Sequence, residues 1–225
     1  MRIAKIFDVA ANDYDATRRK YISCFDDFYG VAIEQIPFKA DEHFSVLDLG
    51  AGTGLFSEMV RSLYPNVTLT LTDISPEMLG KARERFKGTT GIHYLNHDYI
   101  AQPIDGEYDV VISALSLHHS TETQLDQVFS RVYSCLKPGG IFINADQILG
   151  RTPRIEQMYE QAWLEQAESS GCTPEEIKVA MKRMESDKTL PLTLQLDLLE
   201  KTGFSTVNCW YQYYRYAVYS GVKTA

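Results

Sequence analysis

Short apolar runs alternate with amphipathic segments through the middle of the chain. The apolar runs predict strands at residues 45–49, 67–72, 92–95, 108–113 and 141–144. Apolar residues spaced three and four apart predict helices at 55–63, 76–86 and 123–136. Strands that alternate with helices are typical of a parallel sheet covered on both faces. The breakers Lys137–Gly140 predict a turn before the last of these strands.

Two segments depart from this alternation. Residues 1–44 predict an N-terminal helical cover, and residues 150–202 predict a helical insertion that ends with the last sheet-covering helix. The leucines between positions 190 and 198 fit both strand and helix spacing. We expect a helix, because Gly203 then stands where a helix C-cap belongs. Residues 203–225 predict a final strand pair, so we expect a single domain over 1–225.

Composition narrows the class of protein. The 225 residues carry 22 Lys+Arg and 30 Asp+Glu, a formal net charge of −8 with 44% apolar residues, which is typical of a globular chain. We expect no membrane span and no signal peptide, because no long apolar run is present. The negative charge argues against nucleic acid as a partner of the surface as a whole. Four cysteines without a CxxC pair predict unpaired thiols in a cytoplasmic protein and no metal site there.

The strongest local signal is the run Val46-Leu47-Asp48-Leu49-Gly50-Ala51-Gly52-Thr53-Gly54. A strand ends, glycines let the backbone turn, and a helix begins, which presents backbone N–H groups to a ligand. The GxGxG spacing differs from the GxGxxG of nicotinamide enzymes. Asp73 closes the next strand, where a carboxylate can accept hydrogen bonds from both hydroxyls of a ribose.

Together with residues 72–75, 96–99, 108–113 and 136–140, this run resembles the successive motifs of class I S-adenosylmethionine-dependent methyltransferases. The resemblance implies an α/β, doubly wound Rossmann-like fold with a seven-stranded sheet in the order 3-2-1-4-5-7-6, strand 7 antiparallel. It makes residues 45–146 the cofactor-binding core. It also implies S-adenosyl-L-methionine as cofactor, S-adenosyl-L-homocysteine as product, and methyl transfer to a small-molecule acceptor by in-line displacement.

The resemblance also implies roles for individual residues. The methionine portion of the cofactor would lie against Gly50, Ala51 and Gly52, with Asp48 ordering its amino group. Asp73 would bind the ribose and Ile74 one adenine face. The adenine amino group would be read by Asp98 beside Tyr99, and the cofactor would be lined by Ser113 and Ala114. In the N-terminal cover, Tyr14 would cap the methionine portion, and Arg19, with Arg18 as the alternative, would pair with its carboxylate.

The sequence indicates the acceptor-binding and catalytic residues less clearly than the cofactor-binding residues. His118 follows the fourth strand and is a candidate general base or a wall of the acceptor site. A metal site formed with the adjacent His119 is disfavoured, because neighbouring side chains rarely converge on one ion without a third ligand. Tyr159 and Trp163 either cover the acceptor or pack as core. Lys182, Arg183 and Lys188 indicate a solvated basic face.

Two other functions remain open. The tail, with Gly203-Phe204 and the run Cys209–Tyr213, looks like the end of carboxy-S-adenosylmethionine synthase, a tRNA-modification enzyme with this fold. Such an enzyme needs a basic residue for the added carboxylate, and Arg183 and Lys188 are the candidates. A non-catalytic regulatory protein that keeps the fold is the other alternative, which the intact cofactor residues argue against. The aromatic-rich tail is also suited to an interface in a homodimer.

Overall fold

The computed structural model describes the backbone of residues 14–224 and the side chains of residues 17–224. The predicted N-terminal cover therefore lies partly outside the described residues. Its described part contains two helices, α2 (Tyr14–Tyr21) and α3 (Phe25–Glu34). The apolar side chains of α3 are buried, as the spacing predicts.

Seven strands form one sheet in the order β3-β2-β1-β4-β5-β7-β6. The strands are β1 (Ser45–Leu49), β2 (Thr68–Asp73), β3 (Ile92–Asn96), β4 (Tyr108–Ala114), β5 (Leu136–Gln147), β6 (Phe204–Tyr213) and β7 (Tyr216–Lys223). All neighbours pair in parallel except β7, which is antiparallel to β5 and β6. This confirms the predicted fold class and strand order.

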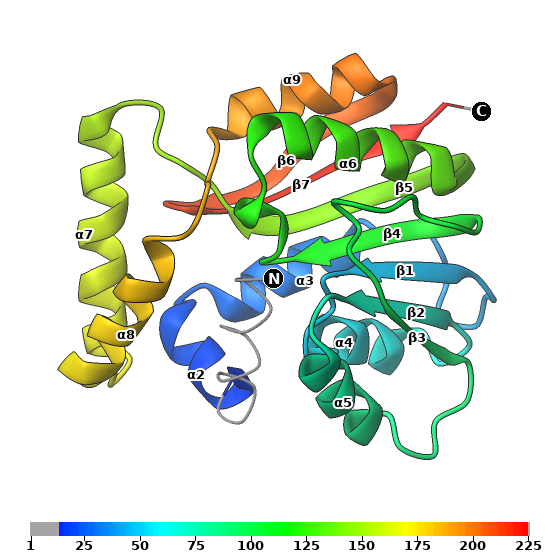
Figure 1. Cartoon of the computed structure of the whole chain (residues 1–225), viewed down its shortest axis with the longest axis horizontal. Helices are drawn as coiled ribbons and strands as arrows, with labels where there is room; N and C mark the ends of the chain where they lie inside the picture. Colours follow the sequence, from blue (N-terminus) through cyan, green and yellow to red (C-terminus); the bar gives the residue numbers. More distant parts are fainter. Residues whose placement is uncertain (1–13, 225) are drawn as a thin grey trace.

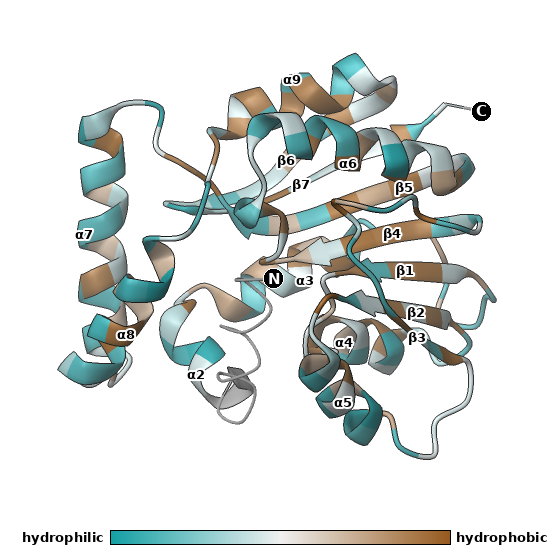
Figure 2. Cartoon of the chain, in the orientation of Figure 1, coloured by the Kyte–Doolittle hydropathy of each residue, from teal (hydrophilic) through white to brown (hydrophobic). Residues whose placement is uncertain are grey.

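Helices cover both faces of the sheet (Figure 1). On one face, α3, α4 (Leu55–Leu63) and α5 (Pro76–Arg85) share a core cluster with Val46 of β1. On the other face, α6 (Glu122–Cys135) and α9 (Leu192–Thr202) share a second cluster with Leu47. Successive strand residues point to opposite faces, so one apolar strand supplies both cores. Figure 2 shows this layering as apolar central strands between helices with hydrophilic outer faces.

A cover of three helices lies beyond the carboxyl ends of the parallel strands (Figure 1). It consists of α2, α7 (Pro153–Ser169) and α8 (Pro174–Met184). The backbone carbonyl of Tyr21 at the end of α2 accepts hydrogen bonds from Trp163 Nε1 at 3.1 Å and from Tyr216 Oη at 2.9 Å. Three segments distant in sequence are therefore fixed to one another at this point.

The main difference from the sequence prediction is in β5. The breakers Lys137–Gly140 do not form a separate turn but belong to β5, which begins at Leu136. The pairing with β4 shifts between Tyr108 and Val110, so the extra residues are accommodated as an irregularity of the ladder. The ambiguous leucines do form a helix, α9, and Gly203 caps it with φ 110°.

Two further predictions concern cysteines and membranes. All four cysteines are unpaired thiols, and three of them are buried. Within residues 14–224, none of the helices combines the length and the apolar character that crossing a bilayer requires.

Candidate active site

The glycine loop joins β1 to α4 through backbone conformations that only glycine adopts readily. Gly50, Gly52 and Gly54 have φ values of 68°, 55° and 79°. A Cβ atom added at Gly50 would lie 1.8 Å from the Oγ atom of Ser116. At Gly52 the same atom would meet nothing within 4 Å, so this part of the loop borders open space. The loop therefore combines a close approach to the end of β4 with room for a ligand.

Asp73 is held against this loop by backbone donors. Its Oδ2 atom accepts a hydrogen bond from the N–H of Gly52 at 2.8 Å, and its Oδ1 atom accepts one from the N–H of Ser75 at 2.8 Å. The register of the sheet explains the meeting, because Leu49 pairs with Thr72 and so brings the ends of β1 and β2 together. These bonds place the carboxylate at the edge of the glycine loop, and a carboxylate there is the type of acceptor that ribose hydroxyls require.

Asp48 is an almost completely buried acidic residue, 1% exposed. The hydroxyl of Ser57 donates a hydrogen bond to its Oδ2 atom at 2.6 Å. Burial raises the pKa of Asp48 to about 7 from 3.8; the Ser57 hydrogen bond opposes this rise and the charge of Asp73 adds to it. A cationic ligand would favour the ionised form, which makes Asp48 suited to an ammonium or sulfonium group.

A small pocket lies between the glycine loop and the N-terminal helices. Its lining includes five of the predicted cofactor residues, namely Asp48, Gly50, Ala51, Gly52 and Ala114. It also includes Arg18 of α2 and Tyr29 of α3. A buried acid and an arginine on opposite elements match the ammonium and carboxylate of a methionine group, so the residues present fit the cofactor.

The two candidate arginines of α2 lie in different places. Arg19 is exposed, pairs with Asp26 at 2.8 Å and lies over the ring of Phe25 at 4.2 Å. It lines neither this pocket nor the one beside His118, and the alternative, Arg18, lines both. The helical turn explains the difference, since adjacent residues of a helix point about 100° apart. The side chain of Tyr14 lies outside the described residues.

The residues predicted to contact adenine and the residue predicted at the end of the fourth strand differ in burial and in hydrogen bonding. Ile74 is partly buried just after β2, where a ring can reach it. The Oδ1 atom of Asp98 accepts hydrogen bonds from the N–H groups of Ile100 at 3.0 Å and Ala101 at 3.1 Å, so one of its oxygens stabilises a turn. The hydroxyl of Ser113 donates to the carbonyl of Leu49 at 2.9 Å and ties β4 to β1.

Tyr99 closes the same end of the site. Its hydroxyl lies 2.6 Å from the Oγ atom of Ser116, the atom that faces Gly50. Burial raises the pKa of Tyr99 well above its ordinary value, so the phenol stays protonated. The contact fixes the end of the β4 loop beside the glycine loop.

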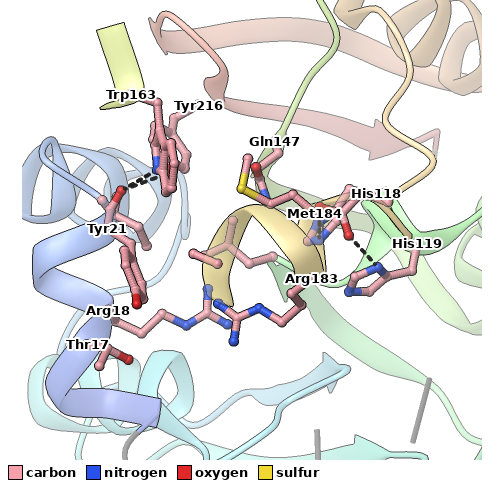
Figure 3. Close-up of a pocket in the computed structure, with 14 residues that line it drawn as sticks. Thr17, Arg18, Tyr21, His118, His119, Gln147, Trp163, Arg183, Met184 and Tyr216 are labelled. Carbon is pink, nitrogen blue, oxygen red and sulfur yellow. Dashed lines mark hydrogen bonds and ion pairs between the residues drawn. The ribbon is translucent and has the colours of Figure 1, made fainter. Parts of the chain in front are cut away.

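A second pocket lies between α2, α8 and the loop after β4 (Figure 3). His118 belongs to a short 3₁₀ turn, η1 (Leu117–His119), and its Nδ1 atom lies 2.6 Å from Oδ1 of Asp146 at the end of β5. Burial lowers the pKa of His118, but the carboxylates of Asp146 and Asp187 outweigh burial, so the pKa is raised above 6.5. With Asp146 accepting the Nδ1 proton, the Nε2 atom is the basic one.

His118, His119 and Asp187 form the cluster best suited to a metal ion among residues 17–224. Their ligand atoms lie within 4.8 Å of one another, with Nδ1 of His119 3.2 Å from Asp187 Oδ1. Two arginines, Arg18 and Arg183, line the same pocket, and their positive charge opposes a divalent cation there. The absence of a metal stays a prediction.

Of the two aromatic candidates for the acceptor site, one lines the second pocket and the other does not. Trp163 is 4% exposed and lines the second pocket, while its indole N–H bonds to the Tyr21 carbonyl (Figure 3). Trp163 is therefore part of the core and also part of the wall of the second pocket. Tyr159 instead contacts the β6–β7 hairpin, where its hydroxyl accepts a hydrogen bond from Gln212 at 2.8 Å. It does not line the pocket.

Sequence reasoning missed Asp146 and only partly identified Arg183. Asp146 is the penultimate residue of a buried strand, close to the strand-end position that Asp73 occupies, and the same position rule would have indicated it. Arg183 was expected on a solvated face, or as a carboxylate-binding residue of the alternative enzyme, and it lines the pocket together with Ala180 and Met184. The spacing of three and four residues along α8 was the available signal.

Comparisons with known proteins agree with this geometry. A family model described as a methyltransferase domain matches residues 46–140. The carboxy-S-adenosyl-L-methionine synthase of Hydrogenovibrio crunogenus is 25% identical over 82% of this chain and 75% of its own length. The malonyl-[acyl-carrier protein] O-methyltransferase of a Marinomonas species is 31% identical over 70% of this chain. The chain covers 56% of that relative's length.

Solved structures extend the agreement to the fold. Human N-acetylserotonin methyltransferase, solved in complex with S-adenosylmethionine, superposes with a TM-score of 0.61 at 21% identity. The match covers 99% of this chain and 56% of the human chain. The sheet order, the glycine loop with its two acids and these matches lead to one conclusion. The chain belongs to the class I S-adenosylmethionine-dependent methyltransferases.

Proposed function

We propose that this enzyme transfers the methyl group of S-adenosylmethionine to a hydroxyl group of a small-molecule acceptor, with His118 as the general base. The observation that carries the proposal is the His118–Asp146 pair, 2.6 Å apart and buried at the wall of the second pocket. Asp146 also accepts hydrogen bonds from the N–H groups of His118 at 3.1 Å and Gln147 at 2.8 Å, which fix its carboxylate. A carboxylate held in this way orients the imidazole and stabilises its protonated form.

The bound cofactor supplies an electrophilic methyl group on a sulfonium that leaves as a neutral thioether. The protein then has three tasks: it aligns the acceptor, excludes water and removes one proton. Nε2 of His118 takes the hydroxyl proton as the new C–O bond forms, and the electrons of the broken C–S bond remain on sulfur. Asp48 and Arg18 would hold the methionine portion, and Asp73 would hold the ribose.

The first test is binding of S-adenosylhomocysteine by calorimetry. Absence of heat at millimolar ligand would remove the basis of the proposal. The second test is methyl transfer from radiolabelled S-adenosylmethionine to a panel of small phenols and alcohols. His118→Gln is expected to lower kcat by about 10²–10⁴-fold, the usual contribution of a positioned base, while leaving S-adenosylhomocysteine affinity unchanged.

A carboxy-S-adenosylmethionine synthase-like activity is the second candidate. The extent of the Hydrogenovibrio match and the position of Arg183 in the pocket favour it. Mass analysis of the nucleoside that copurifies with the protein separates the two, because a carboxylated cofactor is heavier. A non-catalytic role predicts cofactor binding without turnover for every acceptor tried.

Cellular setting and assembly belong to the same proposal. Four unpaired thiols favour a reducing compartment, the cytoplasm. Exposed Trp210, Tyr213 and Tyr214 support pairing of two copies through the β6–β7 hairpin. Sedimentation at micromolar concentration tests the assembly, since a monomer at all concentrations would contradict it.

A further inference from the structure

Two arginines from different helices lie side by side in the wall of the second pocket (Figure 3). Arg18 comes from α2 and Arg183 from α8. Burial lowers the pKa of Arg18, and the positive charge of Arg183 acts in the same direction. The guanidinium of Arg183 therefore adds positive charge to this wall, and that charge attracts an anionic ligand.

Among the residues with described side chains, the two carboxylates at this pocket, Asp146 and Asp187, lie against histidines. Asp146 is bound to His118, and Asp187 lies 3.2 Å from Nδ1 of His119 and 3.8 Å from Nε2 of His118. Among residues 17–224, no ion pair joins a carboxylate to the partly buried guanidinium of Arg183. The charge of Arg183 is therefore available to a ligand in the pocket.

Helix α8 directs this arginine inward. Ala180 and Met184, three residues before and one after it, line the same pocket. The preceding Lys182 points outward and pairs with Glu185 at 2.6 Å, both of them exposed. A capping box at Thr173 fixes the start of the helix, and the burial of Ile177 and Ala180 shows which face of α8 packs against the rest of the protein.

The remaining walls present apolar ring faces. The indole N–H of Trp163 and the hydroxyl of Tyr216 both donate to the Tyr21 carbonyl, and the hydroxyl of Tyr21 donates to the carbonyl of Glu176 at 3.2 Å. With their polar atoms engaged, these three rings offer flat surfaces for an aromatic body. The pocket thus combines a base, an apolar wall and a free cation.

We propose that Arg183 binds a carboxylate of the methyl acceptor, so that the acceptor is a small hydroxylated aromatic acid. This inference rests on the proposed function, because it places the acceptor in the pocket of His118. The hydroxyl group faces the imidazole, the ring lies against Trp163, and the carboxylate is bound by the guanidinium. Arg18, which also lines the cofactor pocket, lies beside Arg183 and adds positive charge there.

The test is calorimetry on protein saturated with S-adenosylhomocysteine. The probes are 2-, 3- and 4-hydroxybenzoate and the corresponding hydroxybenzamides, which have the same shape without the charge. We expect at least one hydroxybenzoate to bind tenfold or more tightly than its amide. Arg183→Gln is expected to abolish that preference, and Arg183→Lys to retain part of it, since lysine keeps the charge but not the fork. Lys182→Gln is the matched control and keeps the preference.

Equal affinity for acids and amides in the wild-type protein would overturn the inference, as would a preference that survives in Arg183→Gln. A variant that loses S-adenosylhomocysteine affinity but keeps the preference would assign Arg183 to the cofactor instead, and so would a copurifying carboxylated cofactor. Each variant is titrated with S-adenosylhomocysteine first. Failure of that titration in the wild-type protein refutes the proposed function, and the same probes added without the nucleoside then test the anion site alone.

Discussion

Replacement of Asp48 by asparagine should stabilise the ligand-free protein while weakening its hold on the cofactor. The carboxyl group is 1% exposed and has one hydrogen-bond partner, the hydroxyl of Ser57. The amide oxygen of asparagine can accept the same hydrogen bond, so the change removes a charge with little change of shape. What remains is the free energy of burying that charge.

The magnitude follows from the pKa. Burial raises the pKa of Asp48 from 3.8 to about 7, so the folded protein keeps a proton that the unfolded chain loses between about pH 4 and pH 7. The ionised group therefore destabilises the fold increasingly as the pH rises through that window, and fully above it. At 1.36 kcal/mol per pKa unit, the destabilisation above pH 7 is about 4 kcal/mol, of which about 2–3 kcal/mol develops between pH 5 and pH 8.

Thermal unfolding at pH 5 and pH 8 measures this difference. Since 1 kcal/mol shifts the Tm of a chain of this size by about 2–4 °C, the advantage of Asp48→Asn over wild type should grow by about 5–10 °C between the two pH values. The exposed Asp41→Asn is the control and should show no such growth. An Asp48→Asn advantage that is the same at both pH values would refute the argument from burial. Calorimetry should also show weaker S-adenosylhomocysteine binding by the variant.

Three further predictions concern the rest of the site. Asp73→Ala should weaken S-adenosylhomocysteine binding more than Asp98→Ala in calorimetry, because two hydrogen bonds to a charged acceptor contribute about 1.5–3 kcal/mol each. One oxygen of Asp98, in contrast, already stabilises its own turn. Equal losses of affinity would contradict the ribose assignment. Gly50→Ala should lower the Tm more than Gly52→Ala, because both have positive φ but only the former meets Ser116, at 1.8 Å; equal Tm values would show that Ser116 moves aside freely. The kcat of methyl transfer should fall as the pH drops through the raised pKa of His118. Asp146→Asn should move this acidic limb of the kcat–pH profile to lower pH, because Asp146 raises the pKa of His118. An unmoved limb would show that Asp146 is not a positioning residue.

The cofactor loop could be predicted because its signals are local, and the order of the sheet was implied by the family resemblance that these signals carry. The glycine spacing after β1 and the acid at the end of β2 lie within 28 residues of one another in the chain, from Val46 to Asp73. Parallel strands bring their carboxyl ends to one edge, so these short motifs meet without further information. The same rule would have indicated Asp146, the penultimate residue of β5.

The second pocket depends on contacts that no local pattern encodes. Tyr21, Trp163 and Tyr216 meet at one backbone carbonyl although up to 195 residues separate them in sequence. Which arginine of α2 faces inward depends on how that helix is rotated against α7, and helical spacing alone leaves both Arg18 and Arg19 eligible. Arg183 is a similar case, because the charged residues around it suggest a solvated helix face until α8 is packed over the strand ends. The sequence alone determined the fold and the cofactor side of the site; the acceptor side was decided by packing between distant helices, because their rotation and contacts are set by the whole chain.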